Sequence, residues 1–296
     1  MNDPDYIIVT PAYNEERYIG ATIDSVLVQT IVPKLWIIVD DGSSDATAAI
    51  IRDKTAHLPW VRYIYRPKRP GQTYYASNVH AIEEGLLTAK DLSYKFLAIL
   101  DADISLPADY YARIFGLFRK DPRLGIASGI YLTRTANGLE SSFHDRRSCP
   151  KNIMVFNPQC FREIGGFLPL KYGGEDTCAC FMARMRGWKV RSFPEIEVAH
   201  NKPPGTGHAS SSVKISFKQG IEEYFLATHP VFMLLKSARR CVQERPFIRS
   251  GAARLYGYVY AHFMGEKRQI ERDLVRFIQR EQVSRIFGLN RVSEEA

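Results

Sequence analysis

The sequence predicts an α/β protein whose mostly parallel sheet is flanked by helices. Apolar segments of strand length alternate with segments of helical periodicity through the first hundred residues, and the connections between them are short. Strands that are joined through helices pair in parallel with a right-handed crossover, which places helices on the faces of the sheet. A chain of 296 residues with 45% hydrophobic content is long enough to bury a sizeable core around such a sheet.

Four apolar segments are the expected strands of the first half: 6–10, 35–39, 61–65 and 96–100. The helix after the first strand should run to about Gln29, and another should run from about Gln72 to Ala89. No G-x-G-x-x-G follows the first strand and no G-x-x-x-x-G-K-S/T occurs in the chain. Their absence argues against a dehydrogenase-type dinucleotide site and against a P-loop.

Carboxylates follow two of these strands. Asp40 and Asp41 come after the second strand, and Asp101 and Asp103 come after the fourth. Side chains at positions i and i+2 of a strand share a face, so Asp101 and Asp103 could approach one divalent cation and the phosphates that it carries. The alternative is a turn that caps a helix starting near Pro107.

The second half of the sheet is expected from segments 124–132, 153–157, 188–193 and 196–200, with a short helix at 158–164. The stretch 133–150 is polar and predicted to be irregular. A helix should start after Gly173 and Gly174, with Glu175 and Asp176 in its first turn. The glycines would let the backbone approach a ligand closely, whereas the alternative places the acids there for the helix dipole alone.

Positive charge is concentrated in the last third of the chain. Residues 202–296 contain 16 Lys and Arg against 9 Asp and Glu, which gives +7 of the total net charge of +8. We therefore expect two domains, 1–201 and 202–296, and predict a helical C-terminal region with a basic surface. Its aromatic segment from Tyr224 to Leu235, followed by cations, fits either helices that cover the core or a helix in an anionic membrane interface.

Several signals bear on the compartment. The apolar run at 6–10 is too short for a signal peptide, and no run reaches the roughly 18 apolar residues of a membrane span. Five cysteines without framework spacing suit a reducing compartment, and we interpret them as core thiols. We expect a cytoplasmic protein, peripheral at the inner face of the membrane if its basic region binds lipid, and no nucleic-acid partner.

Four ordered motifs resemble the signatures of family-two glycosyltransferases of the GT-A fold, over roughly residues 5–200. They are Thr10-Pro11-Ala12-Tyr13-Asn14-Glu15-Glu16, Val39-Asp40-Asp41-Gly42-Ser43-Ser44-Asp45, Leu100-Asp101-Ala102-Asp103 and Gly173-Gly174-Glu175-Asp176. The resemblance implies a Rossmann-like sheet with a helical C-terminal extension. No Gln-x-x-Arg-Trp motif follows, so the chain does not resemble the processive, membrane-embedded polysaccharide synthases.

The resemblance also implies roles for single residues. A nucleotide would lie among Pro11, Tyr13 and Glu15 with its base on Asp41, and Asp101 and Ala102 would face the ribose or the sugar. Asp103 would bind Mn²⁺ or Mg²⁺ with His200, although a histidine there is otherwise more often structural. Asp176 would be the general base, with Glu175 beside it at the substrate.

One position departs from the family pattern. Asn78 stands where the family often has Ala-Arg-Asn, but Ser77 replaces the arginine. We expect Arg66 or Arg69 to make the phosphate or sugar contact instead.

The predicted function is inverting transfer of a single sugar from a nucleoside-diphosphate sugar to an acceptor hydroxyl. The donor is predicted to be a UDP-sugar, because uridine is the commonest base in the family. The acceptor would be a saccharide or a lipid-linked saccharide in polysaccharide or glycolipid assembly, with 133–150 facing the sugar or the acceptor. The alternatives are a non-catalytic sugar-nucleotide-binding or membrane scaffold protein, and a nucleotidyltransferase, whose glycine-rich, arginine-bearing loop the chain lacks.

Overall fold

The computed structural model describes residues 5–135, 138–141, 145–202, 212–243 and 247–288. These residues form two compact units. The first contains the described residues up to Lys171 and from Glu175 to Lys202, and the second contains Tyr172–Gly174 together with the helices after residue 211. No pattern in the sequence indicated that Tyr172–Gly174 would belong to the second unit.

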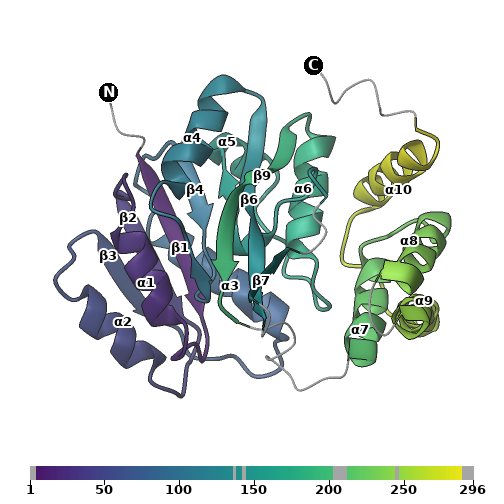
Figure 1. Cartoon of the computed structure of the whole chain (residues 1–296), viewed down its shortest axis with the longest axis horizontal. Coiled ribbons are helices and arrows are strands. Elements are labelled where there is room, and N and C mark those ends of the chain that lie inside the picture. Colours follow the sequence, from purple (N-terminus) through teal and green to yellow (C-terminus); the bar gives the residue numbers. More distant parts are fainter. Residues whose placement is uncertain (1–4, 136–137, 142–144, 203–211, 244–246, 289–296) are drawn as a thin grey trace. The chain divides into compact units, whose positions relative to one another are not determined.

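The first unit is built on one sheet in the order β3-β2-β1-β4-β8-β6-β9-β5, with β7 paired to β6. Its parallel part comprises β1 (Tyr6–Ala12), β2 (Leu35–Asp40), β3 (Val61–Tyr65) and β4 (Phe96–Ile99). The mixed part comprises β5 (Ile104–Ser105), β6 (Leu124–Thr135), β7 (Gly138–Ser141), β8 (Val155–Phe156) and β9 (Lys189–His200). The predicted α/β fold is confirmed (Figure 1). Strand β8, antiparallel to β4 and β6, joins the two parts.

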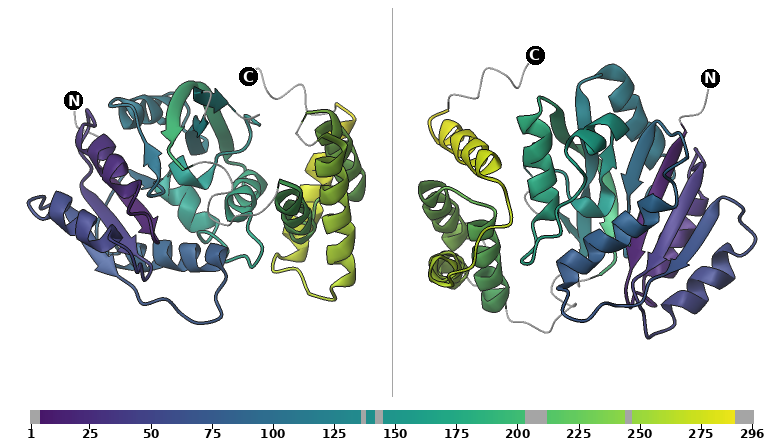
Figure 2. Two further views of the ribbon diagram at one scale, coloured as in Figure 1. Left: turned by 60° about the horizontal axis from the view of Figure 1, so that its bottom comes forward. Right: turned by 180° about the vertical axis from the view of Figure 1, so that it is seen from behind.

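Helices cover both faces of this sheet because its strands are apolar on both sides. They are α1 (Ile19–Leu27), α2 (Thr47–Thr55), α3 (Tyr74–Leu87), α4 (Tyr110–Lys120), α5 (Pro158–Glu163) and α6 (Glu175–Met185). Ile8, Trp36 and Ile38 pack in the cluster to which α1 contributes. The alternate side chains face α3, where a Cβ on Gly85 would lie 2.9 Å from Val9 Cγ1; Figure 2 shows α3 on this opposite face.

One prediction for the mixed part is wrong. The segments 188–193 and 196–200 were expected to be two strands, but they form the single strand β9. Ser192 pairs with Ser128 and Glu197 pairs with Ile130, so the register shifts between these two positions. Pro194 lies in the interval and has no N–H group for the ladder, and a bulge there lets the strand continue past it.

Two other segments also differ from expectation. Part of the stretch 133–150 is regular, because β6 continues to Thr135 and pairs with β7 as a hairpin. Residues 136–137 and 142–144 of that stretch lie outside the described residues. The expected strand at 153–157 is instead a 3₁₀ turn, Lys151–Ile153, followed by the short strand β8.

The second unit is helical, with α7 (Ser212–Phe225), α8 (Pro230–Gln243), α9 (Phe247–Phe263) and α10 (Arg272–Ile286). Helices α7 and α9 cross at two glycines. A Cβ on Gly220 would lie 2.0 Å from the carbonyl oxygen of Arg254, and a Cβ on Gly257 would lie 2.1 Å from that of Phe217. The two backbones are therefore in direct contact at this crossing.

The side chain of Tyr172 fixes the Tyr172–Gly174 segment within the second unit. The Tyr172 ring stacks on Phe225 with 4.4 Å between centroids, and its hydroxyl donates to Glu266 Oε1 at 2.8 Å. Across the described residues, no helix combines the length and the apolar character needed to cross a membrane.

Candidate active site

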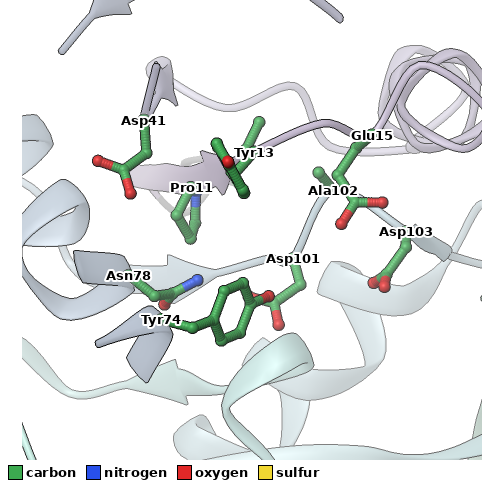
Figure 3. Close-up of a pocket in the computed structure, with 10 residues that line it drawn as sticks. Pro11, Tyr13, Glu15, Asp41, Tyr74, Asn78, Asp101, Ala102 and Asp103 are labelled. Atoms are coloured by element: carbon green, nitrogen blue, oxygen red, sulfur yellow. The ribbon is translucent and has the colours of Figure 1, made fainter. Parts of the chain in front are cut away.

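A pocket opens at the carboxyl ends of β1, β2 and β4 (Figure 3). Its lining is Pro11, Ala12, Tyr13, Glu15, Asp41, Tyr74, Asn78, Asp101, Ala102 and Asp103. All of these except Ala12 and Tyr74 were singled out from the sequence. The parallel register explains the gathering, because Ala12 is opposite Asp40 and Val9 is opposite Ile99, so the loops after the three strands leave the sheet at one edge.

Asp41 is held by several donors at one end of the pocket. Its carboxylate is buried and accepts hydrogen bonds from Arg66 Nη1, from Ser77 Oγ at 2.5 Å and from Lys68 Nζ at 3.4 Å. The Arg66 guanidinium, also buried, donates in addition to Gln72 Oε1 at 3.2 Å. Arg66 therefore compensates the charge of Asp41. Its guanidinium is not free to make the phosphate or sugar contact that was predicted for Arg66 or Arg69.

Asp40 has a structural role that the sequence left unexplained. Its Oδ1 accepts from the Ser43 N–H at 2.8 Å and its Oδ2 accepts from the Tyr63 hydroxyl at 2.8 Å. The first bond closes the turn after β2, where Gly42 adopts a φ of 80°. Asp40 thus shapes the loop that presents Asp41.

The Tyr13 ring borders the same end of the pocket. Lys68 Nζ lies 3.4 Å from the centroid of this ring, a cation–π contact. Arg69 is exposed and lies outside the lining of the pocket, so its predicted contact with a substrate stays a prediction.

Glu15 lies at the other end of the pocket. Its side chain is buried; Oε1 accepts from Lys202 Nζ at 2.5 Å, and Oε2 has no hydrogen-bond partner among the described residues. Burial raises the pKa of Glu15 to about 7, and the charges of Asp103 and Asp101 raise it too, although Lys202 acts in the opposite direction. Figure 3 shows the three carboxylates turned toward one cavity.

Asp103 and His200 are brought together by strand pairing. Ile104 of β5 is opposite His200 of β9, and His200 Nε2 lies 3.3 Å from Asp103 Oδ2. Burial disfavours the charged imidazole, but the hydrogen bond and the charge of Asp103 raise the pKa of His200 above its ordinary value.

The chemistry of this pair fits a divalent cation. Asp103 Oδ1 is buried without a hydrogen-bond partner in the described part of the chain, so an acceptor oxygen remains available. The described residues contain no group of three or more His, Cys, Asp or Glu that could hold a metal by themselves. The pair could bind an ion whose other ligands come from a substrate or from water.

Lys151 is a site residue that the sequence analysis missed. Its side chain is buried, and Nζ donates to Asn78 Oδ1 at 2.8 Å and to Asp101 Oδ1 at 3.0 Å. Burial alone would lower the pKa of Lys151, but the negative charges of Asp101 and Glu175 raise it above its ordinary value. No sequence signal pointed to a lone lysine fifty residues from Asp101.

Glu175 and Asp176 begin α6 after two glycines with positive φ, 93° at Gly173 and 84° at Gly174. Glu175 is buried, and burial raises its pKa, an effect that Lys151 opposes. Asp176 is half-buried; Oδ1 accepts from the Thr177 N–H at 2.6 Å and Oδ2 from the Lys151 N–H at 3.5 Å. Neither acid lines the pocket. Lys151 nevertheless links Asp176 to the pocket, because its backbone N–H bonds Asp176 and its ammonium group bonds Asp101.

Residues 7–186 match glycosyl transferase family 2. The chain belongs to this family. It is therefore a glycosyltransferase, and the resemblance of the four motifs is confirmed. The scaffold and nucleotidyltransferase alternatives are set aside.

Similar proteins of known sequence or structure agree. Poly-beta-1,6-N-acetyl-D-glucosamine synthases from Staphylococcus epidermidis and Staphylococcus aureus are 32% and 30% identical over 117 residues, 40% of this chain. The match spans 26% of their length.

Two solved structures share the fold. The mannosyltransferase PcManGT from Pyrobaculum calidifontis, in complex with GDP-Man and Mn²⁺, has a TM-score of 0.58 at 15% identity. The match covers 100% of this chain and 89% of that one. GalNAc-T7, in complex with UDP, GalNAc and Mn²⁺, has a TM-score of 0.55 at 17% identity, with 76% of this chain and 50% of that chain covered.

Proposed function

We propose that this glycosyltransferase moves a single sugar, with inversion, from a UDP-sugar to a hydroxyl of a saccharide or lipid-linked saccharide. The observation that carries the proposal is the pocket at the strand ends, where Asp41 lies at one end and the Asp103–His200 pair at the other. The names of the curated relatives support a saccharide acceptor and a role in polysaccharide assembly.

In this proposal Asp41 and Tyr13 take the base of the nucleotide. The Asp41 carboxylate can accept a hydrogen bond from an imide N–H, and the Tyr13 ring offers a face on which a base can stack. Asp101 would accept from a hydroxyl of the ribose or of the sugar. The bonds that Asp41 receives from Arg66 and Ser77 support this role, because they fix the carboxylate before a ligand arrives.

Asp103 and His200 would hold a divalent cation. When bound, the cation would supply positive charge against the departing diphosphate. Two observations support it: the buried Asp103 Oδ1 without a partner among the described residues, and the Mn²⁺ in both structural neighbours.

Asp176 would accept the proton of the acceptor hydroxyl as that oxygen attacks the anomeric carbon from the face opposite the leaving group. An alcohol loses its proton only well above pH 7, so a positioned carboxylate is needed. Attack from the far face inverts the configuration, by the geometric logic that separates inverting from retaining glycosidases.

A donor screen tests this function. The purified protein would be incubated with UDP-N-acetylglucosamine, UDP-glucose or GDP-mannose, with and without Mn²⁺, and release of the nucleoside diphosphate would be measured. We expect release from a UDP-sugar only when metal is present. Release from GDP-mannose alone would overturn the uridine assignment, and equal rates in a chelator would overturn the metal.

We further propose that the helical unit binds an anionic membrane surface, which would place the enzyme as a peripheral protein at the inner face of the membrane. On α8 the side chains of Val231, Leu234, Leu235 and Val242 are half or more exposed, and their spacing puts them on one face of the helix. Exposed apolar residues in a strongly basic region are typical of helices that lie in a membrane interface.

Liposome co-sedimentation tests this membrane proposal. Binding to anionic vesicles should fall with added salt, because exposed charges are screened within about 8 Å at physiological ionic strength. Replacing both Leu234 and Leu235 by Gln should weaken binding. Leu87→Gln, at a leucine of α3 in the first unit that is at least as exposed, is the control and should leave binding unchanged. Equal recovery with neutral and anionic vesicles would contradict the proposal.

A further inference from the structure

Lys151 occupies a central place between two sets of acids. Its Nζ donates to Asn78 Oδ1 and to both carboxylate oxygens of Asp101, at 3.0 and 3.3 Å. Asn78 and Asp101 both line the pocket of Figure 3. Its own N–H points to Asp176 Oδ2 at 3.5 Å, and its positive charge acts on Glu175. A single residue thus contacts the acid at the end of β4 and the acid at the start of α6.

The backbone around Lys151 is fixed to β4. The Asp101 N–H donates to the Asn152 carbonyl at 3.0 Å, and the Ile99 N–H donates to the Met154 carbonyl at 2.8 Å. These bonds hold the 3₁₀ turn beside the strand that carries Asp101. The position of the ammonium group is therefore set by the backbone as well as by its own hydrogen bonds, as preorganised sites require.

The charge of Lys151 matters for an anionic ligand. A diphosphate that enters the pocket meets Glu15, Asp101 and Asp103, which line it. Arg66 and Lys202 are bound to Asp41 and Glu15, so each already compensates another acid. Lys151 is the lysine whose ammonium bonds Asp101, and it compensates the charge of that carboxylate. Without it, Asp101 would repel the diphosphate at short range in a poorly screened environment.

We propose that Lys151 is a positioning residue of the donor site, which orients Asp101 and Asn78 and offsets the negative charge of Asp101 when the diphosphate arrives. The inference rests on the proposed function. It also suggests how the chain functions with Ser77 in the motif, because the 3₁₀ turn before β8 supplies a cation beside Asn78.

A double-mutant cycle tests the inference. Binding of UDP and of GDP in the presence of Mn²⁺ would be measured by titration calorimetry for the wild type, Lys151→Met, Asp101→Asn and the double variant. Lys151→Met should weaken binding by about 10- to 100-fold, the range for a lost charge-assisted hydrogen bond. In the Asp101→Asn background the same change should have a clearly smaller effect, because the carboxylate whose charge Lys151 offsets is gone and only the bond to Asn78 is left to lose.

The double variant also controls for a loss of binding that is caused by misfolding. Lys151→Met leaves the partly buried Asp101 carboxylate without its cation, whereas the double variant removes both charges together, so it is the form expected to fold. Lys189→Met, which breaks a surface pair with Asp121, is the control and should bind as the wild type does. In steady-state assays of the variants that fold, loss of Lys151 should raise the donor KM and leave the acceptor KM unchanged.

Three results would overturn the inference. If Lys151→Met binds the nucleotide as tightly as the wild type and only melts at a lower temperature, its role is structural. If the double variant binds about tenfold more weakly than Asp101→Asn, Lys151 does not act through Asp101. If the wild type itself binds neither UDP nor GDP, the proposed function fails, and the inference fails with it.

Discussion

The two ends of the pocket treat their buried carboxylates in opposite ways. Asp41 accepts hydrogen bonds from Arg66, Ser77 and Lys68. At the other end, Glu15 Oε2 and Asp103 Oδ1 are buried with no partner among the described residues. A buried acceptor without a donor costs about 1–3 kcal/mol, more when it is charged, so the second end carries an unfavourable energy that the first does not.

This difference separates a part of the pocket whose carboxylate is fully hydrogen-bonded before a ligand binds from a part whose carboxylates keep oxygens that no described residue pairs. The Asp41 end is complete in the free protein, and substitutions there should act first on stability. The Asp103 end is incomplete, and substitutions there should act first on binding. The following experiments test that division, from the largest expected effect to the smallest.

The largest effect is expected outside both ends of the pocket, at α6, where Asp176 is proposed to act only during transfer. Asp176→Asn keeps the shape of the side chain and removes its basicity, so kcat should fall by about 10²–10⁴ with the donor Kd little changed. Glu175→Gln is the control, because Glu175 is buried while Asp176 is half-buried. If the glutamine variant loses more activity than the asparagine variant, the general base is Glu175.

Arg66→Met tests the complete end of the pocket. It leaves Asp41 as a buried charge without its closest partner, so we expect the free energy of unfolding to fall by about 3–5 kcal/mol, measured by denaturant titration. Replacing Arg66 and Asp41 together, by Met and Asn, should cost clearly less. A single variant that is as stable as the wild type would show that the ion pair does not support the fold.

Asp103→Ala tests the incomplete end. Metal-dependent binding of the nucleotide should be lost, by about 100-fold or more, because the cation loses a protein ligand, and Asp101→Ala should weaken binding less. Stability without ligand should be unchanged or slightly higher, since a buried oxygen without a donor is removed. Unchanged nucleotide affinity with Mn²⁺ in calorimetry would contradict the assignment.

The pH dependence of stability gives the smallest effect. The pKa of Glu15 is about 7 in the folded protein against an ordinary value of 4.5, so between these values the folded state holds a proton that the unfolded chain has released. Stability is therefore lost as the pH rises through this window. Without metal, the Tm of the wild type should fall more than that of Glu15→Gln between about pH 5 and pH 8. An excess of about 2–4 °C corresponds to ~1 kcal/mol in domains of this size, and parallel curves for the two proteins would contradict the raised pKa.

Local patterns predicted much of the fold and the acidic part of the pocket. Strands buried on both faces are continuous apolar runs, and acids that follow such runs must lie at the carboxyl edge of a parallel sheet. Asp41, Asp101 and Asp103 were found in this way. The family resemblance added Pro11 and Tyr13, which no periodicity indicates.

The missed features depend on contacts between distant segments. Lys151 follows a polar stretch, and only the pairing of β8 with β4 brings it to Asp101. The burial of Arg66 against Asp41 and Ser77 could not be told from an ordinary charged loop. The bulge that unites β9 was hidden because Pro194 usually ends a strand in a sequence-based assignment.

The packing of α7 against α9 depends on two glycine positions in the helical unit. Since a methyl group at Gly220 or Gly257 would overlap a backbone carbonyl, and no flexible side chain stands between the helices to yield, a one-carbon change would force the pair apart. Neither glycine lines the pocket. Gly220→Ala should therefore disrupt the packing of the helical unit without changing any residue that lines the nucleotide pocket. With it, the contribution of the helical unit to nucleotide binding can be measured separately from that of the residues that line the pocket.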